Sequence, residues 1–391
     1  MSDQENIQKN IYEQRLNHQL EIQSRQIDSI LSQHEIPAQV AGGRVQSRSI
    51  RFDFYSHLES GLERLRGITQ DLLLALGVPD GKLVNENGNW QLFVTRPEDP
   101  PVSLLDLLPI LPELPAMSVP LGVDEDGRPV IFNFLQDGLT HCLIAGNNEA
   151  GKTSLLRAIG LSLALAYKQS QLQIVILDVS QKSKHTDHPH LDPLTFLPHM
   201  LGPVAHGVEE LAEYLKFLVA ETKYRQEERL QTPRIVVLID EVMNLLANGD
   251  EAVRADLAQV IQRGGEAGIY ILMSTERPES SHLSSLMRAN LPARLVGRVN
   301  DASQAVAAVG KNDSQAKYLL GKGDFLAYIN GETTHFQAAY IGDYDLHLAL
   351  QTLHRQRSRP LLAHPISLPQ NGNTAVQDNQ FRVNGDGVEI D

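Results

Sequence analysis

The sequence predicts an α/β protein in which a large, mostly parallel sheet follows a small α+β unit and an N-terminal helix. Two patterns support this prediction. From residue 121 to residue 352, short apolar runs alternate with stretches of helical periodicity, as in parallel strands covered by helices. Residues 37–120 instead show strand-like alternation around one helical stretch, and residues 1–36 are polar with an apolar stripe at helical spacing.

The composition is that of a folded protein, with 42% hydrophobic and 21% charged residues among 391. The 34 Lys and Arg against 48 Asp and Glu give a net charge of −14, which excludes a protein coated in positive charge. This balance is compatible with nucleic-acid binding, because a few basic groups in a channel can hold phosphates. The single cysteine, Cys142, excludes an internal disulfide and lies in an apolar run, so we expect a buried, unreactive thiol.

Neither end of the chain carries a membrane or export signal. No apolar run approaches the roughly 20 residues of a membrane span, and the first residues do not resemble a signal peptide. Residues 353–391 begin with a short basic linker and continue as a polar tail that we expect to be disordered. We therefore expect a cytoplasmic protein with no membrane partner.

The small unit is predicted from short local patterns. In residues 1–36, apolar positions up to Pro37 favour a helix packed on its own domain, with a partner or self-association helix as the alternative. Gly42 and Gly43 are expected to mark a break between two elements of secondary structure. The remaining elements are a strand at 50–55, a helix at 58–76, a turn at 85–89, a strand at 90–95 and a Pro-rich exit at 97–120.

The large unit is predicted from buried apolar runs separated by helices. Four runs are expected to form parallel strands, at residues 142–145, 174–177, 235–239 and 269–273. Residues 153–167 and 208–231 have helical periodicity. Further strands are expected at 293–299 and 325–329, with 335–341 at one edge of the sheet.

The strongest motif is the phosphate-binding loop GNNEAGKT, because an apolar strand precedes it and an apolar helix follows it. Its glycines let the backbone N–H groups and the helix N-terminus face phosphates. Lys152 is expected to reach the β and γ phosphates, and the Thr153 hydroxyl to ligate Mg²⁺. The residues expected to bind the nucleotide are Gly146, Asn147, Asn148, Glu149, Ala150, Gly151, Lys152, Thr153 and Ser154.

Two later strands also end in polar residues. The run RIVVLIDE puts Asp240 and Glu241 at the carboxyl end of a parallel strand, where ligands sit in open α/β sheets. Asp240 is expected to hold Mg²⁺, and Glu241 to act as general base for the attacking water. In the run IYILMSTERP, the apolar strand ends in Ser274 and Thr275, hydroxyl residues placed to sense a γ-phosphate or to position water.

These segments, in this order, resemble the motor of FtsK/SpoIIIE-type DNA translocases, relatives of the HerA-like ring ATPases. The resemblance covers about residues 40–345. Two of its stretches are especially diagnostic, because P-loop proteins in general have no reason to carry them. The stretches are LTHCLIAGNNEAGKTSLL, RIVVLIDEVMNLL, AGIYILMSTERP and the two diagnostic ones, LMRANLPARLVGRV and LLGKGDFL.

The resemblance implies a RecA-like P-loop ATPase core at residues 121–352 that uses ATP and Mg²⁺. It also implies a homohexameric ring that hydrolyses ATP between subunits and threads double-stranded DNA. The chain after residue 353 is too short for a sequence-reading winged-helix module, so we expect contacts mainly to backbone phosphates. Residues 277–288 are a candidate pore loop.

The family's active site implies four catalytic residues in this chain. Lys152, Glu241 and Thr275 come from the three motifs above. The fourth is an arginine supplied in trans to stabilise charge on the transferring phosphoryl group. It corresponds to Arg294 in the LPAR segment, with Arg298 and Arg288 as alternatives.

The chain departs from the family pattern at three places. Glu276 stands where the family usually has Gln, so a carboxylate would lie near the γ-phosphate and be repelled by it. Residues 178–180 lack the lysine of the family's DPK-like triplet, and residues 301–304 lack an arginine. Separately, the histidines and aspartates at 184–192 favour a polar surface loop, with a zinc site as the alternative.

Two alternatives to a DNA motor follow from the same motifs. Ring ATPases of type VII secretion systems share them and move proteins, although they generally carry several motor domains and membrane anchors. A nucleotide-dependent DNA-binding adaptor with weak turnover is the other alternative, and Glu276 is the residue that supports it.

Overall fold

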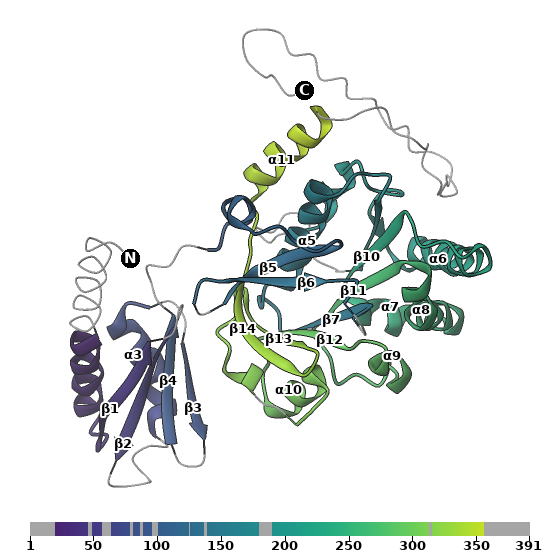
Figure 1. Ribbon diagram of the computed structural model, residues 1–391. Helices are drawn as coiled ribbons and strands as arrows, with labels where there is room; N and C mark the ends of the chain where they lie inside the picture. The colour runs from purple at the N-terminus through teal and green to yellow at the C-terminus, as the bar shows by residue number, and fades with distance from the viewer. Residues whose placement is uncertain are drawn as a thin grey trace, which may run out of the picture.

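The computed structural model describes residues 20–355, with short gaps at 46–48, 57–63, 79–80, 87–88, 96–100, 125, 137–138, 180–189 and 313–314. Its strands form two sheets, one of four strands and one of ten, each covered by helices (Figure 1). The predicted α/β class, with a small unit before a large one, is confirmed. The polar tail and the first half of the N-terminal helix lie outside the described residues.

The small unit is an antiparallel sheet in the order β1-β2-β4-β3. Alternation along β2 buries Ile50, Phe52 and Phe54, and residues 20–33 form a helix that adds Ile27 and Leu31 to the same core. In its described part, the N-terminal helix therefore packs on its own domain. The elements are β1 (Ala38–Val45), β2 (Ser49–Ser56), η1 (Arg64–Ile68), α3 (Thr69–Leu76), β3 (Gly81–Glu86) and β4 (Asn89–Thr95).

The predicted interruption at Gly42 and Gly43 is wrong, since both residues lie inside β1. A Cβ at Gly43 would lie 2.2 Å from the carbonyl oxygen of Arg51 on β2, so this glycine permits a close approach of two backbones. Strand β3 was also missed, because the polar residues at its end were interpreted as part of a turn.

The large sheet has the order β6-β5-β14-β13-β12-β7-β11-β10-β8-β9. The strands from β12 to β9 run parallel, and those from β12 to β6 pair antiparallel. All four predicted buried strands are confirmed. The strands are β5 (Ser118–Asp124), β6 (Pro129–Asn133), β7 (His141–Ala145), β8 (Leu172–Asp178), β9 (Ala205–His206), β10 (Arg234–Asp240), β11 (Ile269–Thr275), β12 (Ala293–Gly297), β13 (Asp324–Ile329) and β14 (Glu332–Ala338).

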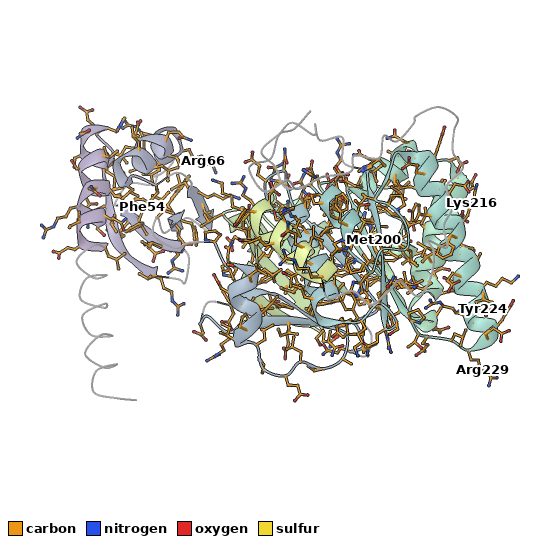
Figure 2. All side chains as sticks on the ribbon, turned by 90° about the horizontal axis from the view of Figure 1, so that it is seen from above. Phe54, Arg66, Met200, Lys216, Tyr224 and Arg229 are labelled. Carbon is orange, nitrogen blue, oxygen red and sulfur yellow. The ribbon has the colours of Figure 1, made fainter. Side chains whose placement is uncertain are left out.

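Helices cover both faces of this sheet, and alternate strand residues fill a core on each side. Figure 2 labels Phe54 and Arg66 in the small unit, and Lys216 and Tyr224 along one helix of the large unit. One core contains residues of α4, α5, η3 and α11, and the other contains residues of α6 to α10. The helices are α4 (Leu104–Leu107), η2 (Leu108–Ile110), α5 (Lys152–Ala166), η3 (Asp192–Phe196), α6 (Val208–Glu228), α7 (Val242–Asn248), α8 (Glu251–Arg263), η4 (Gly265–Ala267), α9 (Ser285–Ala289), α10 (Ala302–Val309), η5 (Gln315–Tyr318) and α11 (Asp343–Arg355).

Three boundaries differ from the sequence prediction. Leu104, Leu107 and Val119 are buried in the core of the large unit, so this unit already includes residues placed before 121. Strand β14 is not at the edge, because β5 pairs with it and β6 lies beyond. Helix α11 continues to Arg355, past the start of the predicted linker.

Candidate nucleotide-binding site

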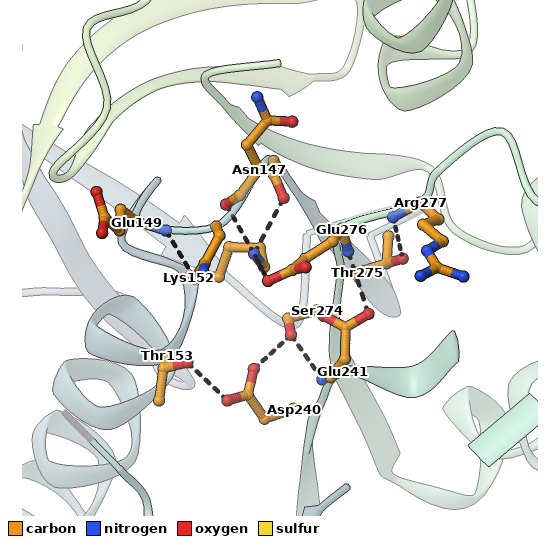
Figure 3. A network of polar contacts seen from close by, with 12 residues as sticks. Asn147, Glu149, Lys152, Thr153, Asp240, Glu241, Ser274, Thr275, Glu276 and Arg277 are labelled. Atoms are coloured by element: carbon orange, nitrogen blue, oxygen red, sulfur yellow. Dashed lines mark hydrogen bonds and ion pairs between the residues drawn. The ribbon is translucent and has the colours of Figure 1, made fainter. Parts of the chain in front are cut away.

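The site lies where three adjacent parallel strands end. Strands β7, β11 and β10 are neighbours in the sheet. In the register of β7 and β11, Ala145 pairs with Thr275. The carboxyl ends of parallel strands meet at one edge of the sheet, which is where α/β proteins bind ligands. The phosphate-binding loop, Asp240 with Glu241, and Thr275 with Glu276 therefore converge at this edge (Figure 3).

The loop is fixed by backbone hydrogen bonds from segments far along the chain. The Gly146 N–H donates to Thr275 O at 3.1 Å, and the Asn147 N–H donates to Arg298 O at 2.7 Å. On the other side, the Lys322 N–H donates to Glu149 O at 2.9 Å. These bonds hold the curled loop in place without a ligand.

Gly151 ends the loop as the N-cap of α5, with a left-handed φ of 102°. It has no side chain that could cap the first helical turn, and the N-terminus of a helix is suited to bind an anion. The loop and the first turn of α5 line a cavity of about 510 Å³. Opposite them, the cavity is lined by Pro101, Lys322, Gly323, Gln337, Ala338, Ala339 and Tyr340. A nucleotide fits a cavity of this volume.

The predicted magnesium ligands lie in contact. The Thr153 hydroxyl donates to Asp240 Oδ2 at 2.6 Å, and the Ser274 hydroxyl donates to Asp240 Oδ1 at 2.5 Å. Both Thr153 and Asp240 are buried. A hydroxyl and a carboxylate are oxygen ligands of the kind that Mg²⁺ prefers, so these residues fit a Mg²⁺–nucleotide complex.

Glu241 follows Asp240 in a left-handed backbone conformation, with φ and ψ both 57°. Its N–H donates to Ser274 Oγ at 2.8 Å, and its Oε1 accepts from the Glu276 N–H at 3.3 Å. Burial is the main cause that raises the pKa of Glu241 to about 7, against the opposing charge of Lys152. A carboxylate with this pKa is suited to accept a proton near neutral pH.

Lys152 is buried at the start of α5 and points along the loop. Its ammonium donates to Gly146 O at 3.0 Å and to Asn147 O at 2.9 Å, and it forms an ion pair with Glu276 Oε1 at 3.4 Å. The loop lysine, Asp240 and Glu241 thus meet as the sequence predicted, and Glu276 joins them.

The two hydroxyl residues at the end of β11 have different partners. Thr275, the predicted catalytic residue, accepts the Arg277 N–H at 2.9 Å and so shapes the turn after the strand. Ser274 instead contacts Asp240 and Glu241. Because side chains alternate along a strand, only one of two neighbours can face these two residues, and it is Ser274, whereas the resemblance had implied Thr275.

The predicted trans arginine is buried inside its own domain. Arg294 is 7% exposed, and its guanidinium donates to Ala308 O at 3.2 Å and to Arg288 O at 3.0 Å. Burial also lowers its pKa. Reaching a neighbouring protomer would break both bonds, so this placement does not fit a residue supplied in trans.

The two alternative arginines also bind carbonyls of their own chain. Arg298 donates to Leu320 O at 3.1 Å. Arg288 donates to Leu283 O at 2.9 Å and also to Pro278 O and Ser280 O, which ties down the candidate pore loop at 277–288. In that loop Arg277 is exposed.

Two other expectations concern groups outside the nucleotide cavity. Cys142 is fully buried in β7, and burial raises the pKa of its thiol to about 12, as expected for an unreactive cysteine. Most of the histidine-rich segment at 184–192 lies outside the described residues. Among those that the structure does describe, no three His, Cys, Asp or Glu residues are grouped to hold a metal. No helix in the described ranges is both long and apolar enough to span a bilayer.

Sequence comparisons connect this site to one family. Residues 113–232 match the FtsK/SpoIIIE family. An uncharacterized FtsK-like protein of Nostoc sp. is 30% identical over 254 residues, which cover 59% of this chain and 34% of that protein. The DNA translocase FtsK of Lactiplantibacillus plantarum is 23% identical over 372 residues, 87% of this chain and 45% of the translocase. The chain thus spans less than half the length of these relatives.

Solved structures share the fold. The pCW3 conjugation coupling protein TcpA, in its monomer form with ATPγS, has a TM-score of 0.55 at 17% identity and covers 81% of this chain and 93% of TcpA. The cytoplasmic domain of the type VII secretion ATPase EccC of Thermomonospora curvata also has a TM-score of 0.55, at 19% identity, covering 65% of this chain and 34% of EccC.

Proposed function

We propose that this chain, which is similar to FtsK/SpoIIIE-type P-loop ATPases, hydrolyses ATP to move double-stranded DNA through a homohexameric ring. The observation that carries the hydrolysis is the meeting of Lys152, Asp240 and Glu241 at the ends of three adjacent strands. These are the groups that phosphoryl transfer to water needs: a cation for the phosphates, a metal ligand and a base.

Each residue has a defined task in this proposal. Lys152 and the N–H groups of the loop bind and orient the phosphates. Thr153 and Asp240 would hold Mg²⁺, which neutralises charge on the phosphates when it is bound. Glu241 accepts a proton from the attacking water, for which a pKa of about 7 is well matched.

DNA is proposed as the cargo because curated relatives named DNA translocases align with most of this chain, 87% in one case. With a net charge of −14, the chain cannot attract DNA over its whole surface. The proposed contacts are therefore restricted to a narrow channel lining that holds backbone phosphates, which makes binding largely independent of sequence. Arg277, exposed in the candidate pore loop, is one basic group for such a lining.

The test compares ATP hydrolysis with and without long duplex DNA, in wild type and in Glu241→Gln. We expect strong stimulation by duplex, and a loss of turnover of about a hundredfold or more in the variant, because the base is removed while the packing is kept. Nucleotide binding by Glu241→Gln, measured with a fluorescent analogue, is the control for an intact site. Turnover that ignores DNA would instead support a protein cargo, and no turnover in wild type would support an adaptor.

A further inference from the structure

The ion pair between Lys152 and Glu276 connects the two cavities of the site. Lys152 lines the cavity of about 510 Å³ that fits the nucleotide. Glu276, together with Glu241, lines a second cavity of about 380 Å³ on the other side. The carboxylate therefore lies at the phosphate end of the site, beyond the ammonium (Figure 3).

The lysine ammonium has three N–H donors, and three of the acceptors that it contacts bear on this inference. Two of these acceptors are carbonyl oxygens of the loop backbone, Gly146 O and Asn147 O. The loop backbone is itself held by other segments, so these oxygens cannot move away freely. The third acceptor is the Glu276 side chain, 37% exposed, and it is the acceptor that a phosphate oxygen can displace most easily.

Glu276 also stands close to a second negative group. Its N–H donates to Glu241 Oε1 at 3.3 Å, so the two glutamates are neighbours at this end of the site. A γ-phosphate entering between these side chains would meet two carboxylates, whereas a nucleotide that ends at its β-phosphate would not. Like charges that are brought close together disfavour each other.

We propose that Glu276 is a built-in counter-ion of Lys152 that competes with nucleotide phosphates and selects against the triphosphate relative to the diphosphate. This inference rests on the proposed nucleotide site. Glu276 acts as a positioning residue: it holds the lysine in the nucleotide-free chain and has to turn away before Lys152 can bind a γ-phosphate. A glutamine at the same position keeps the size of the side chain but carries no charge to compete.

The experiment measures the affinities for ADP and for a non-hydrolysable ATP analogue, with Mg²⁺, by titration calorimetry. We expect Glu276→Gln to bind the ATP analogue about tenfold more tightly than wild type, with a change of less than about threefold for ADP. Glu276→Ala should change the ratio in the same direction. Glu279→Gln removes a charge from the same exposed turn without touching Lys152, and should leave both affinities as in wild type.

The outcomes separate this inference from the function on which it rests. If wild type and Glu276→Gln both bind nucleotide with the same ratio of affinities, Glu276 is no counter-ion, and the ATPase proposal stands. If neither protein binds either nucleotide while both unfold cooperatively at similar temperatures, the nucleotide site is wrong, and the inference fails with it. An equal gain for ADP and the analogue would also overturn the selection proposed here.

Discussion

At the scale of single residues, the site is held together by Ser274. Its hydroxyl donates to Asp240 Oδ1 and accepts the Glu241 N–H, so one side chain orients both carboxylate residues. The sequence predicted Lys152, Asp240 and Glu241 from their motifs, because the chemistry of each motif requires that residue type. It did not single out Ser274 over Thr275, because a difference of one position on a strand acquires meaning only when the two faces of the sheet are known.

Replacing this serine should weaken the metal site. We expect Ser274→Ala to raise the Mg²⁺ concentration needed for half-maximal ATP hydrolysis by about tenfold, because Asp240 loses the group that orients it. Magnesium titrations of the ATPase rate check this expectation. Ser162→Ala is the matched control: it removes a buried hydroxyl that makes no hydrogen bond to any residue the structure describes, and should leave the titration unchanged. A Ser274→Ala titration identical to that of wild type would contradict this role.

At the scale of elements, the phosphate-binding loop is clamped by the segment that leads into β13. The N–H groups of Lys322 and Gly323 donate to the carbonyls of Glu149 and Ala150, at 2.9 and 2.8 Å. This gives a physical reason for the LLGKGDFL stretch, which the sequence connected to the family without assigning it a task. A Cβ on Gly151 would lie 2.8 Å from the Gly323 nitrogen.

The clamp predicts an unequal cost for two glycine substitutions. Gly151→Ala should lower the free energy of unfolding by about 3 kcal/mol and weaken nucleotide binding, because it combines a left-handed φ with a clash against backbone. Gly331→Ala also has a left-handed φ, of 84°, but meets nothing within 4 Å, so its cost should be about 1 kcal/mol with unchanged binding. Urea unfolding and nucleotide titration measure both. Equal costs for the two variants would mean that the close approach to Gly323 is unimportant.

Elements without a strong local pattern were the ones that the sequence missed. Strand β1 contains two adjacent glycines, which ordinarily weaken a strand, yet Gly43 is needed there for close contact with β2. The position of β14 inside the sheet depends on β5, which comes earlier in the chain and pairs with it, and on β6, which pairs with β5. Such pairings depend on distant partners, so local periodicity cannot reveal them.

At the scale of the whole molecule, one lysine of the small unit feels the charges of two basic residues of the large one. Burial, followed by the charges of Arg298 and Lys317, lowers the pKa of Lys82 on β3 to about 8. Lys82 therefore lies near two cations of the large unit although the chain carries a net charge of −14. These three cations are a local exception to the acidic balance of the chain.

The proposed DNA cargo predicts binding that depends on salt and not on sequence. We expect the dissociation constant for a duplex to rise about tenfold or more between 50 and 200 mM salt, because each phosphate contact releases counterions. Two duplexes of unrelated sequence should differ by less than about threefold. Fluorescence anisotropy measures both effects, and mass photometry of the same samples counts the protomers. Affinity that is independent of salt, or a strong preference for one duplex, would contradict phosphate-based binding.

The sequence by itself determined the four buried parallel strands of the large unit, the loop, and the identities of Lys152, Asp240 and Glu241. These features follow from local periodicity and from short motifs, which are complete within a few residues. Only the tertiary structure decided that Ser274 orients the carboxylates, that Arg294 is buried, and that Glu276 pairs with Lys152. Lys152 and Glu276 are 124 positions apart in the chain, and a contact over such a separation depends on which strands become neighbours.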